Sequence, residues 1–220
     1  METPHDLPVV AGGDHPVLAA GDYVLRRWEL TDLAAVEEAS ADPYIPLVNT
    51  VPAVYTHEAG VAFVERQWAR PASGLYPFAI SRAADGRAVG HAGLRIMGPD
   101  RAEAGYWVVP SARRAGAAQS ALRALSAWGL HELGIAQVEL HIEPWNTGSL
   151  RTAESCGYRP DGLPPGSRRV RSEMRDMLRY TTPRTPPGRS GPAARPGPPP
   201  APSAGGRPTR TPRTTGRPGA

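Results

Sequence analysis

The pattern of hydrophobic and polar residues predicts a series of short strands and amphipathic helices from about residue 23 to residue 180. Strands are indicated where hydrophobic residues alternate with polar ones, or run together, between turn residues. The predicted strands are Tyr23–Trp28, Leu75–Ser81, Ala88–Met97, Ala102–Val109, Ile135–Ile142 and Met174–Tyr180. Helical spacing predicts helices over Leu33–Ala39, His57–Trp68, Gln119–Leu133 and Ser149–Ser155.

Several helix ends carry recognisable signals. Thr31 and Asp32 supply an N-cap signal for the first helix. Gly134 and Gly157 each follow a predicted helix, where glycine commonly closes the last turn. The order β-α-α-β-β-β-α-β-α-β combines an antiparallel meander with one strand–helix–strand crossover, which indicates an α+β fold with a mixed central sheet.

Composition divides the chain. From about residue 181 to residue 220 there is no Val, Ile, Leu, Met or aromatic residue. Such a segment buries too little apolar surface to offset the entropy of ordering it. We therefore expect a flexible arm over residues 1–21, a folded domain over 22–182 and a disordered Pro/Arg/Gly-rich tail over 183–220.

Charge divides at the same place. All 25 basic residues are arginines, and seven of them lie in the tail, which contains no acid. The rest of the chain carries 18 arginines against 21 acids and is mildly acidic. The basic pI of the whole chain therefore does not indicate a domain that binds a specific nucleic acid. The tail is interpreted as a solubilising extension, or as a segment that contacts RNA or an acidic membrane non-specifically.

Cysteine and hydropathy narrow the class further. Cys156 is the single cysteine, so neither a disulfide framework nor a metal cluster is expected, and its thiol is expected to pack as a small hydrophobic group. His131 and His141 lack metal-ligand spacing and are expected to be structural. No basic N-terminal region or long apolar run is present, so we expect a cytoplasmic protein with no membrane partner.

The segment most indicative of chemistry joins the strand that ends at Val109 to the following helix. It contains Arg113 and Arg114, followed by the small residues Ala115, Gly116, Ala117 and Ala118. Small residues allow the backbone to approach a ligand closely, and a helix N-terminus with nearby arginines attracts anions. A pyrophosphate fits such a loop, although an exposed basic loop would have the same local sequence.

These residues resemble the acetyl-CoA-binding motif [QR]-x-x-G-x-[GA] of GNAT acetyltransferases, with Arg113, Gly116 and Ala118 at the specified positions. Asn146 to Ser149, followed by Ala153, Cys156, Gly157 and Tyr158, resemble the family's N-x-x-[AS] helix ending in G-[FY]. Ala102 to Val108 is similar to the "AEIGYW" strand of the RimJ/RimL branch. Leu25 to Trp28 with Thr31 and Asp32 is similar to that branch's opening "LRPW…ED".

The resemblance implies a GNAT-like, mixed and mostly antiparallel central sheet flanked by helices in three layers. It also implies that an amine attacks acetyl-CoA directly in a ternary complex, with no metal. The residues implied to bind the cofactor are Trp107, Val108, Val109, Arg113, Arg114, Ala115, Gly116, Ala117, Ala118 and Asn146.

Two catalytic roles are implied. Glu103 occupies the position of the general base, since the attacking amine must be neutral. Ser149 occupies the position of the acid that protonates the thiolate. Each residue also has an ordinary structural interpretation: a surface carboxylate for Glu103, and a helix cap or turn for Ser149 and Asn146.

The sequence departs from the family pattern at two positions. Ala153 stands where many members have a tyrosine, and Arg114 stands where a glycine is common. The acceptor is implied to be a protein N-terminus or a small-molecule amine, including a cationic metabolite or drug, and a homodimer is possible. The alternative function is a non-catalytic acyl-CoA-binding sensor or interaction domain.

Overall fold

A computed structural model describes residues 15–162, 166–170 and 173–184. Its strands are β1 (Leu18–Ala20), β2 (Tyr23–Arg26), β3 (Leu75–Arg82), β4 (Ala88–Ile96), β5 (Arg101–Val108), β6 (Gln137–Ile142), β7 (Arg159–Pro160), β8 (Gly166–Val170) and β9 (Glu173–Thr181). Its α-helices are α1 (Leu33–Ser40), α2 (Ile45–Val48), α3 (His57–Ala69), α4 (Ala117–Ala127) and α5 (Thr147–Ser155). Short 3₁₀ turns cover Leu30–Asp32, Arg70–Ser73 and Pro110–Ala112, and a π-helical turn covers Trp128–Glu132.

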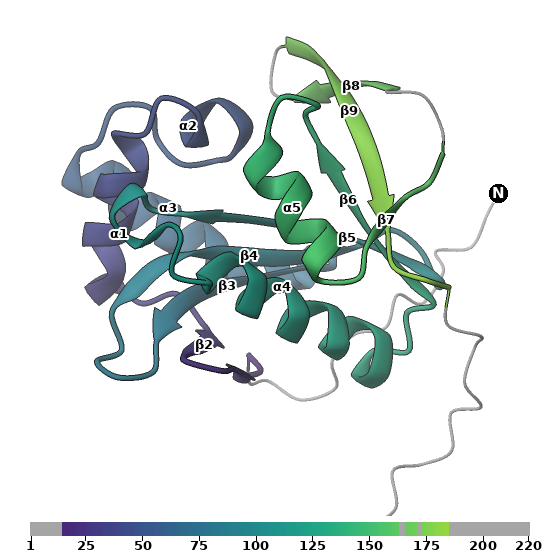
Figure 1. The fold of residues 1–220 in the computed structure, drawn as a ribbon. Helices are drawn as coiled ribbons and strands as arrows, with labels where there is room; N and C mark the ends of the chain where they lie inside the picture. Colours follow the sequence, from purple (N-terminus) through teal and green to yellow (C-terminus); the bar gives the residue numbers. More distant parts are fainter. Residues whose placement is uncertain (1–14, 163–165, 171–172, 185–220) are drawn as a thin grey trace, which may run out of the picture. The chain divides into compact units, whose positions relative to one another are not determined.

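The strands form a mixed sheet in the order β1-β2-β3-β4-β5-β6-β9-β7, with β8 paired to β9. Every pairing is antiparallel except that between β5 and β6, which α4 connects as a crossover. Figure 1 shows the helices placed around this sheet, with α4 and α5 beside each other. The predicted α+β fold with a mixed, mostly antiparallel sheet is therefore confirmed.

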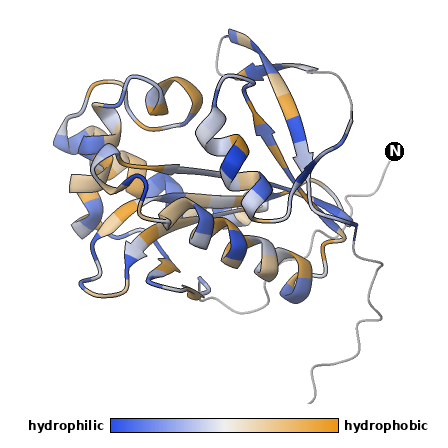
Figure 2. Cartoon of the chain, in the orientation of Figure 1, coloured by the Kyte–Doolittle hydropathy of each residue, from blue (hydrophilic) through white to orange (hydrophobic). Residues whose placement is uncertain are grey.

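The helices cover both faces of the sheet. Residues of β4 alternate between the faces. The side chain of Leu94 lies against Gly129, next to α4, whereas the ring of His91 lies against Trp28, which packs on Phe63 of α3. The helix α4 thus covers one face and α3 the other, and Figure 2 shows that α4 carries both hydrophobic and hydrophilic residues.

The centre of the sheet is buried on both faces. In β3, Tyr76 to Ser81 are all buried, so buried and exposed positions do not alternate along it. The reason is that β3 lies between β2 and β4 with helices on both sides, so both sets of its side chains face protein. Trp28, Phe63, Phe78 and Leu94 are among the largest fully buried side chains.

The structure corrects two local predictions and confirms a third. Residues 18–20, assigned to a loose arm, form β1 and pair with β2. The helix predicted as continuous over Gln119–Leu133 begins at Ala117 and changes to a π turn at Trp128. The predicted N-cap position is confirmed, since Asp32 directly precedes α1. Its carboxylate makes no cap hydrogen bond to α1, but accepts two hydrogen bonds of 2.8 Å from the guanidinium of Arg26 and one of 2.9 Å from the N–H of Glu29.

Some expectations lie outside the described residues. These are the flexible arm, for residues 1–14, and the disordered tail, for residues 185–220. Within the described part of the chain, no helix is long and apolar enough to span a bilayer.

Candidate active site

The strands β5 and β6 separate in the middle of the sheet. They pair only from Arg101 to Glu103 on β5 and from Gln137 to Glu139 on β6. Beyond Glu103, β5 continues to Val108 beside β4, and β6 pairs with β9 on its other side. The two parallel strands therefore leave a gap whose edge is formed by residues 104–108 of β5.

The carbonyl of Val108 faces this gap, since it accepts a hydrogen bond of 3.1 Å from Nε of Arg113. Both backbone polar groups of a strand residue point to the same side. The N–H of Val108 therefore also faces the gap, as an oxyanion or pantetheine donor would require. Trp107 is buried, with its ring stacked on His91 at a centroid distance of 5.9 Å.

The loop between β5 and α4 has a specialised backbone. Arg114 has φ 65° and Gly116 has φ 82°, both in the left-handed region. Gly116 is the N-cap of α4 and provides no side-chain cap. The first backbone bond of the helix is donated by Ser120 to Gly116, so the N–H groups of Ala117, Ala118 and Gln119 precede it and remain available for an anion.

Three contacts from earlier segments hold this loop. The carboxylate of Glu38 accepts hydrogen bonds from the N–H and the hydroxyl of Ser111, at 2.7 and 2.9 Å. The hydroxyl of Tyr23 donates to the carbonyl of Ala115 at 2.9 Å. The third contact is the ion pair between Arg113 and Asp42, at 2.6 Å.

Arg113 thus has a different environment from the one its motif suggests. Its guanidinium binds Asp42, whose carboxylate is buried and also accepts from the N–H groups of Tyr44 and Ile45. Burial alone would raise the pKa of Asp42, but the hydrogen bonds from Ile45, Tyr44 and Arg113 lower it. Arg113 therefore ties the start of α2 to the loop, while the backbone N–H groups of α4 face the anion site.

A cavity of about 740 Å³ follows the loop and runs between α4 and α5. Among the predicted cofactor-binding residues, its lining includes Trp107, Val108, Arg113, Arg114, Gly116, Ala117, Ala118 and Asn146. Val109 is buried, and Val109 and Ala115 are not part of this lining. Arg151 adds a third guanidinium to the wall. A partly apolar cavity lined by arginines and by the start of α4, with its available N–H groups, suits the phosphates and pantetheine arm of a coenzyme A molecule.

The first turn of α5 separates the roles of Asn146 and Ser149. The side-chain oxygen of Asn146 caps α5 by accepting a hydrogen bond of 3.2 Å from the N–H of Ser149. Ser149 is therefore not the cap, and it lies in the wall of the cavity. The hydroxyl of Tyr106 is 3.5 Å from the Ser149 carbonyl, and burial raises the pKa of that phenol.

A second cavity, of about 480 Å³, lies on the face of the sheet that carries α3. Its lining includes Glu103, Trp107 and His91, which occupy that face through the pairing of β4 and β5. The two cavities share the residues Tyr44, Ile45, Tyr106, Trp107, Asn146 and Ser149. They therefore meet at the gap between β5 and β6.

Glu103 lies in the second cavity, between two basic side chains. Its carboxylate accepts a hydrogen bond of 2.7 Å from Arg168 on β8, and Nδ1 of His141 lies 3.7 Å away. Burial would raise the pKa of Glu103, but hydrogen bonds from His141 and Arg168 and the charge of Arg168 lower it to about 2. Glu103 is therefore no isolated surface carboxylate, and His141, expected to be structural, belongs to the same cluster.

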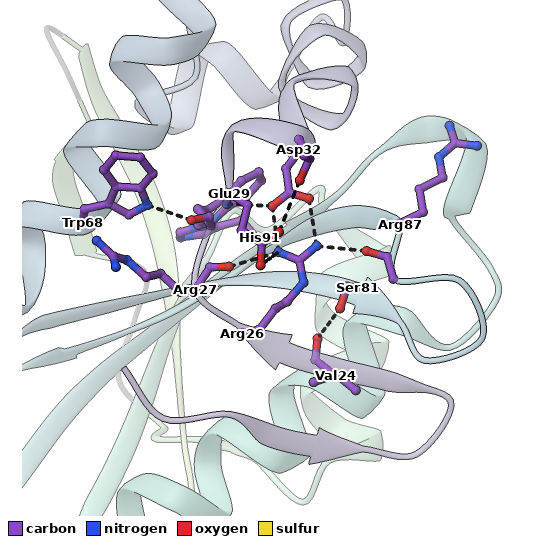
Figure 3. Close-up of polar contacts among 12 residues, drawn as sticks. Val24, Arg26, Arg27, Glu29, Asp32, Trp68, Ser81, Arg87 and His91 are labelled. Carbon is purple, nitrogen blue, oxygen red and sulfur yellow. Dashed lines mark hydrogen bonds and ion pairs between the residues drawn. The ribbon is translucent and has the colours of Figure 1, made fainter. Parts of the chain in front are cut away.

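His91 has a defined tautomer. Nδ1 of its ring accepts a hydrogen bond of 3.2 Å from the indole N–H of Trp28. Burial, with the positive charge of Arg70, lowers the pKa of His91 to about 3, so the ring is neutral and its proton is on Nε2. The indole N–H of Trp68 donates to the carbonyl of Trp28, just beyond β2, at 2.7 Å. Figure 3 shows Trp68 and His91 in this group of polar contacts.

Sequence reasoning did not identify Tyr44 and Glu143. The hydroxyl of Tyr44 donates to the buried carboxylate of Glu143, which also accepts a hydrogen bond of 2.9 Å from Arg175. Burial, followed by the hydrogen bond and charge of Glu143, raises the pKa of Tyr44. Tyr44 directly precedes α2 and Glu143 directly follows β6, and no local motif links them. Among the described residues, no group of His, Cys, Asp and Glu side chains is arranged to hold a metal ion.

The chain is similar to acetyltransferases in sequence and in fold. Residues 23–159 match the family model described as the acetyltransferase (GNAT) domain. No curated protein matches the chain.

Solved structures share the fold. A GNAT-family acetyltransferase from Bacillus anthracis superposes with a TM-score of 0.64 at 23% identity, covering 76% of this chain and 97% of that one. Mycobacterium smegmatis RimJ, solved with CoA-disulfide, gives a TM-score of 0.63 at 24% identity, over 76% and 85% of the two chains. RimL, a ribosomal L7/L12 α-N-protein acetyltransferase solved with coenzyme A, gives 0.61 at 14% identity, over 76% and 97%.

Proposed function

Because the chain belongs to the GNAT acetyltransferase family and is an acetyl-CoA-dependent N-acetyltransferase, we propose that its acceptor amine attacks the thioester directly within a ternary complex. One observation carries this proposal: the cavity along α4 and the cavity on the α3 face share six lining residues at the β5–β6 gap. Two substrates that enter from opposite faces can therefore meet there without a covalent enzyme intermediate.

We place the diphosphate of acetyl-CoA at the N-terminus of α4. The N–H groups of Ala117 and Ala118 and the side chain of Arg114 would bind it. The pantetheine arm would follow the open edge of β5, where the N–H of Val108 would also stabilise the oxyanion. Asn146 would contact the same arm through its side-chain amide, whose oxygen also accepts the capping bond from Ser149.

Glu103 is the proposed base. Four residues of β5 separate it from Trp107, a distance of roughly 13 Å at the usual rise per residue, so bound water would relay the proton. A carboxylate with a pKa of about 2 stays ionised, but it has a small driving force for accepting a proton. Displacement of Arg168 from Glu103 by the bound acceptor would increase that driving force, because Arg168 is one of the groups that lower the pKa.

Ser149 is the proposed acid that protonates the thiolate. Its position in the shared wall supports this role, and Asn146 already performs the capping function. Tyr106 is a second candidate, since its hydroxyl lies against the same turn of α5. Ala153, where many relatives have a tyrosine, is fully buried and lines neither cavity, so the hydroxyl must come from another position.

The acceptor is proposed to be a protein N-terminus or a small-molecule amine. The names of the RimJ and RimL structures support the first. The alternative is a domain that binds acetyl-CoA without turnover, and the experiment must distinguish it from an active transferase.

The test is the release of free coenzyme A thiol from acetyl-CoA in the presence of a panel of amines. Glu103→Gln should lower kcat/KM by about 10²- to 10⁴-fold with an unchanged Kd for acetyl-CoA, and the loss should shrink as pH approaches the pKa of the amine. Ser149→Ala should lower turnover without that rescue, and Tyr106→Phe reports whether the phenol contributes. Tight acetyl-CoA binding with no thiol release for any amine would identify a sensor.

A further inference from the structure

Among the described residues, two of the arginines that line the cavity on the α3 face have no carboxylate within 4 Å. Arg70 and Arg95 both line it. Within the described part of the chain, neither is among the arginines that lie within 4 Å of a carboxylate oxygen. One N–H of Arg70 donates to the hydroxyl of Thr50 at 3.0 Å, and the pKa of Arg70 is lowered by burial and by the charges of Arg66 and Arg95. The two guanidinium groups therefore repel one another.

The carboxylates in the same cavity are already neutralised. Glu103 is paired with Arg168, and Glu143 is paired with Arg175 and hydrogen-bonded by Tyr44. His91 contributes no acceptor on this side, because Nδ1 is occupied by Trp28 and Nε2 carries the proton. The unpaired charge in this cavity is therefore positive, although the folded part of the chain is mildly acidic.

The sheet register places this charge relative to the gap. Arg95 is directly opposite Glu103, whereas His91 is opposite Trp107 at the junction of the cavities. Arg95 is thus four residues of β5, roughly 13 Å, from the level of Trp107, and the charge of Arg70 acts on His91 at that level. The guanidinium pair therefore lies on the order of 10 Å from the point where the amine must react. An extended peptide spans that distance with about three residues.

Building on the acetyl transfer proposed above, we propose that Arg70 and Arg95 select an acceptor that carries an anionic group about 10 Å from its reactive amine. A peptide N-terminus with Asp or Glu at its second or third position has this form. Its carboxylate would bind the two guanidinium groups, and its α-amine would lie at the β5–β6 gap. Polyamines and other polycations would be repelled from the same cavity.

The experiment compares short peptides that differ at one position. Each carries Asp or its uncharged isostere Asn at position two, three or six, and the full-length chain is assayed by kcat/KM for thiol release. We expect Asp at position two or three to be preferred over Asn by roughly 10- to 100-fold, the range of a charge-assisted hydrogen bond. Asp at position six should give no preference, and the preference should decrease with added salt.

Three variants test the residues. In Arg70→Gln and in Arg95→Gln, the ratio of kcat/KM for the Asp and Asn peptides should fall towards one. Arg95→Glu should reverse the preference towards peptides with Lys at the same position. Arg87→Gln removes an exposed arginine that does not line the cavity, and it should retain the wild-type ratio. Thermal denaturation of each variant checks that the fold is retained.

The outcomes separate this proposal from the one on which it rests. Equal kcat/KM for Asp and Asn peptides, with thiol still released, would overturn the substrate preference and leave the acetyltransferase intact. Turnover of free acidic amines such as glutamate, with no peptide accepted, would overturn the peptide proposal in the same way. No thiol release with any amine, despite acetyl-CoA binding, would overturn the proposed function itself.

Discussion

The guanidinium of Arg113 donates to the carboxylate of Asp42 at 2.6 Å, although 71 residues separate them in the chain. The side chain of Asp42 is only 4% exposed, and that of Arg113 is 48% exposed. The pair connects the start of α2 to the loop that precedes α4. Both residues line the cavity between α4 and α5, so loss of the pair should affect both stability and the proposed binding of coenzyme A.

We expect Asp42→Asn to lower the free energy of unfolding at pH 7 by about 2 kcal/mol, because a buried charge-assisted hydrogen bond is lost. The folded-state pKa of Asp42 is lowered, so its stabilisation is complete above the unfolded-state value of about 3.9 and disappears as pH falls through the folded-state value. The difference between wild type and variant should therefore shrink below about pH 4. Urea denaturation from pH 7 to pH 3 measures it.

Asp85→Asn is the matched control. Asp85 also pairs with an arginine, Arg82, but both side chains are almost half exposed. Exposed pairs contribute little, so this variant should change the free energy of unfolding far less than Asp42→Asn does. Equal effects of the two substitutions would show that burial does not determine the strength of the Asp42 pair.

Arg114 has φ 65°, a backbone conformation that glycine adopts without strain. We expect Arg114→Gly to raise the free energy of unfolding by about 0.5–1 kcal/mol, since relief of strain exceeds the added flexibility of the unfolded chain. The same substitution removes a positive charge from the anion site. A weaker Kd for coenzyme A in calorimetric titration would therefore show that Arg114 contacts the phosphates.

Arg87→Gly tests whether glycine is favourable at any exposed arginine. Arg87 has no positive φ and lies on the turn before β4. Glycine there should be neutral or slightly destabilising because only the entropic cost remains. Stabilisation by both substitutions would refute the strain at Arg114.

Gly90 and Trp107 approach closely where β4 and β5 pair. A Cβ atom at Gly90 would lie 2.3 Å from the carbonyl oxygen of Trp107. We expect Gly90→Ala to lower the free energy of unfolding by about 2–3 kcal/mol and to weaken acetyl-CoA binding, because β5 must shift. The control is Gly105→Ala, where an added Cβ meets nothing within 4 Å and stability should change by less than about 0.5 kcal/mol.

The fold was predictable where side-chain pattern and burial agree. Apolar runs such as those of β4 and α4 have the period of their elements. The structure confirms β4 to within one residue of its predicted ends and the start of α4 to within two residues, whereas α4 changes to a π turn before its predicted end. The strand β8 was missed because Gly166–Val170 contains two arginines and one apolar residue, so only its pairing with β9 makes it a strand. The four-residue helix α2 is too short to show a period.

The candidate site divides in the same way. The loop from Arg113 to Ala118 is recognisable because one contiguous segment provides its backbone geometry. The cavity on the α3 face is not recognisable from the sequence, because its arginines come from separate segments. Arg70 follows α3, Arg95 belongs to β4 and Arg168 belongs to β8. Only the sheet brings these arginines together. The pairing of Arg113 with Asp42 could not be predicted either, because 71 residues separate them and no local motif links them.

The three contacts that hold the loop before α4 also determine when this site can form during folding. Tyr23, Glu38 and Asp42 reach Ala115, Ser111 and Arg113 across 92, 73 and 71 residues. Contacts of such long range form only after the intervening strands have assembled. Recovery of coenzyme A binding during refolding should therefore follow the slowest structural phase, and coenzyme A capture would report completion of the whole domain rather than of the loop alone.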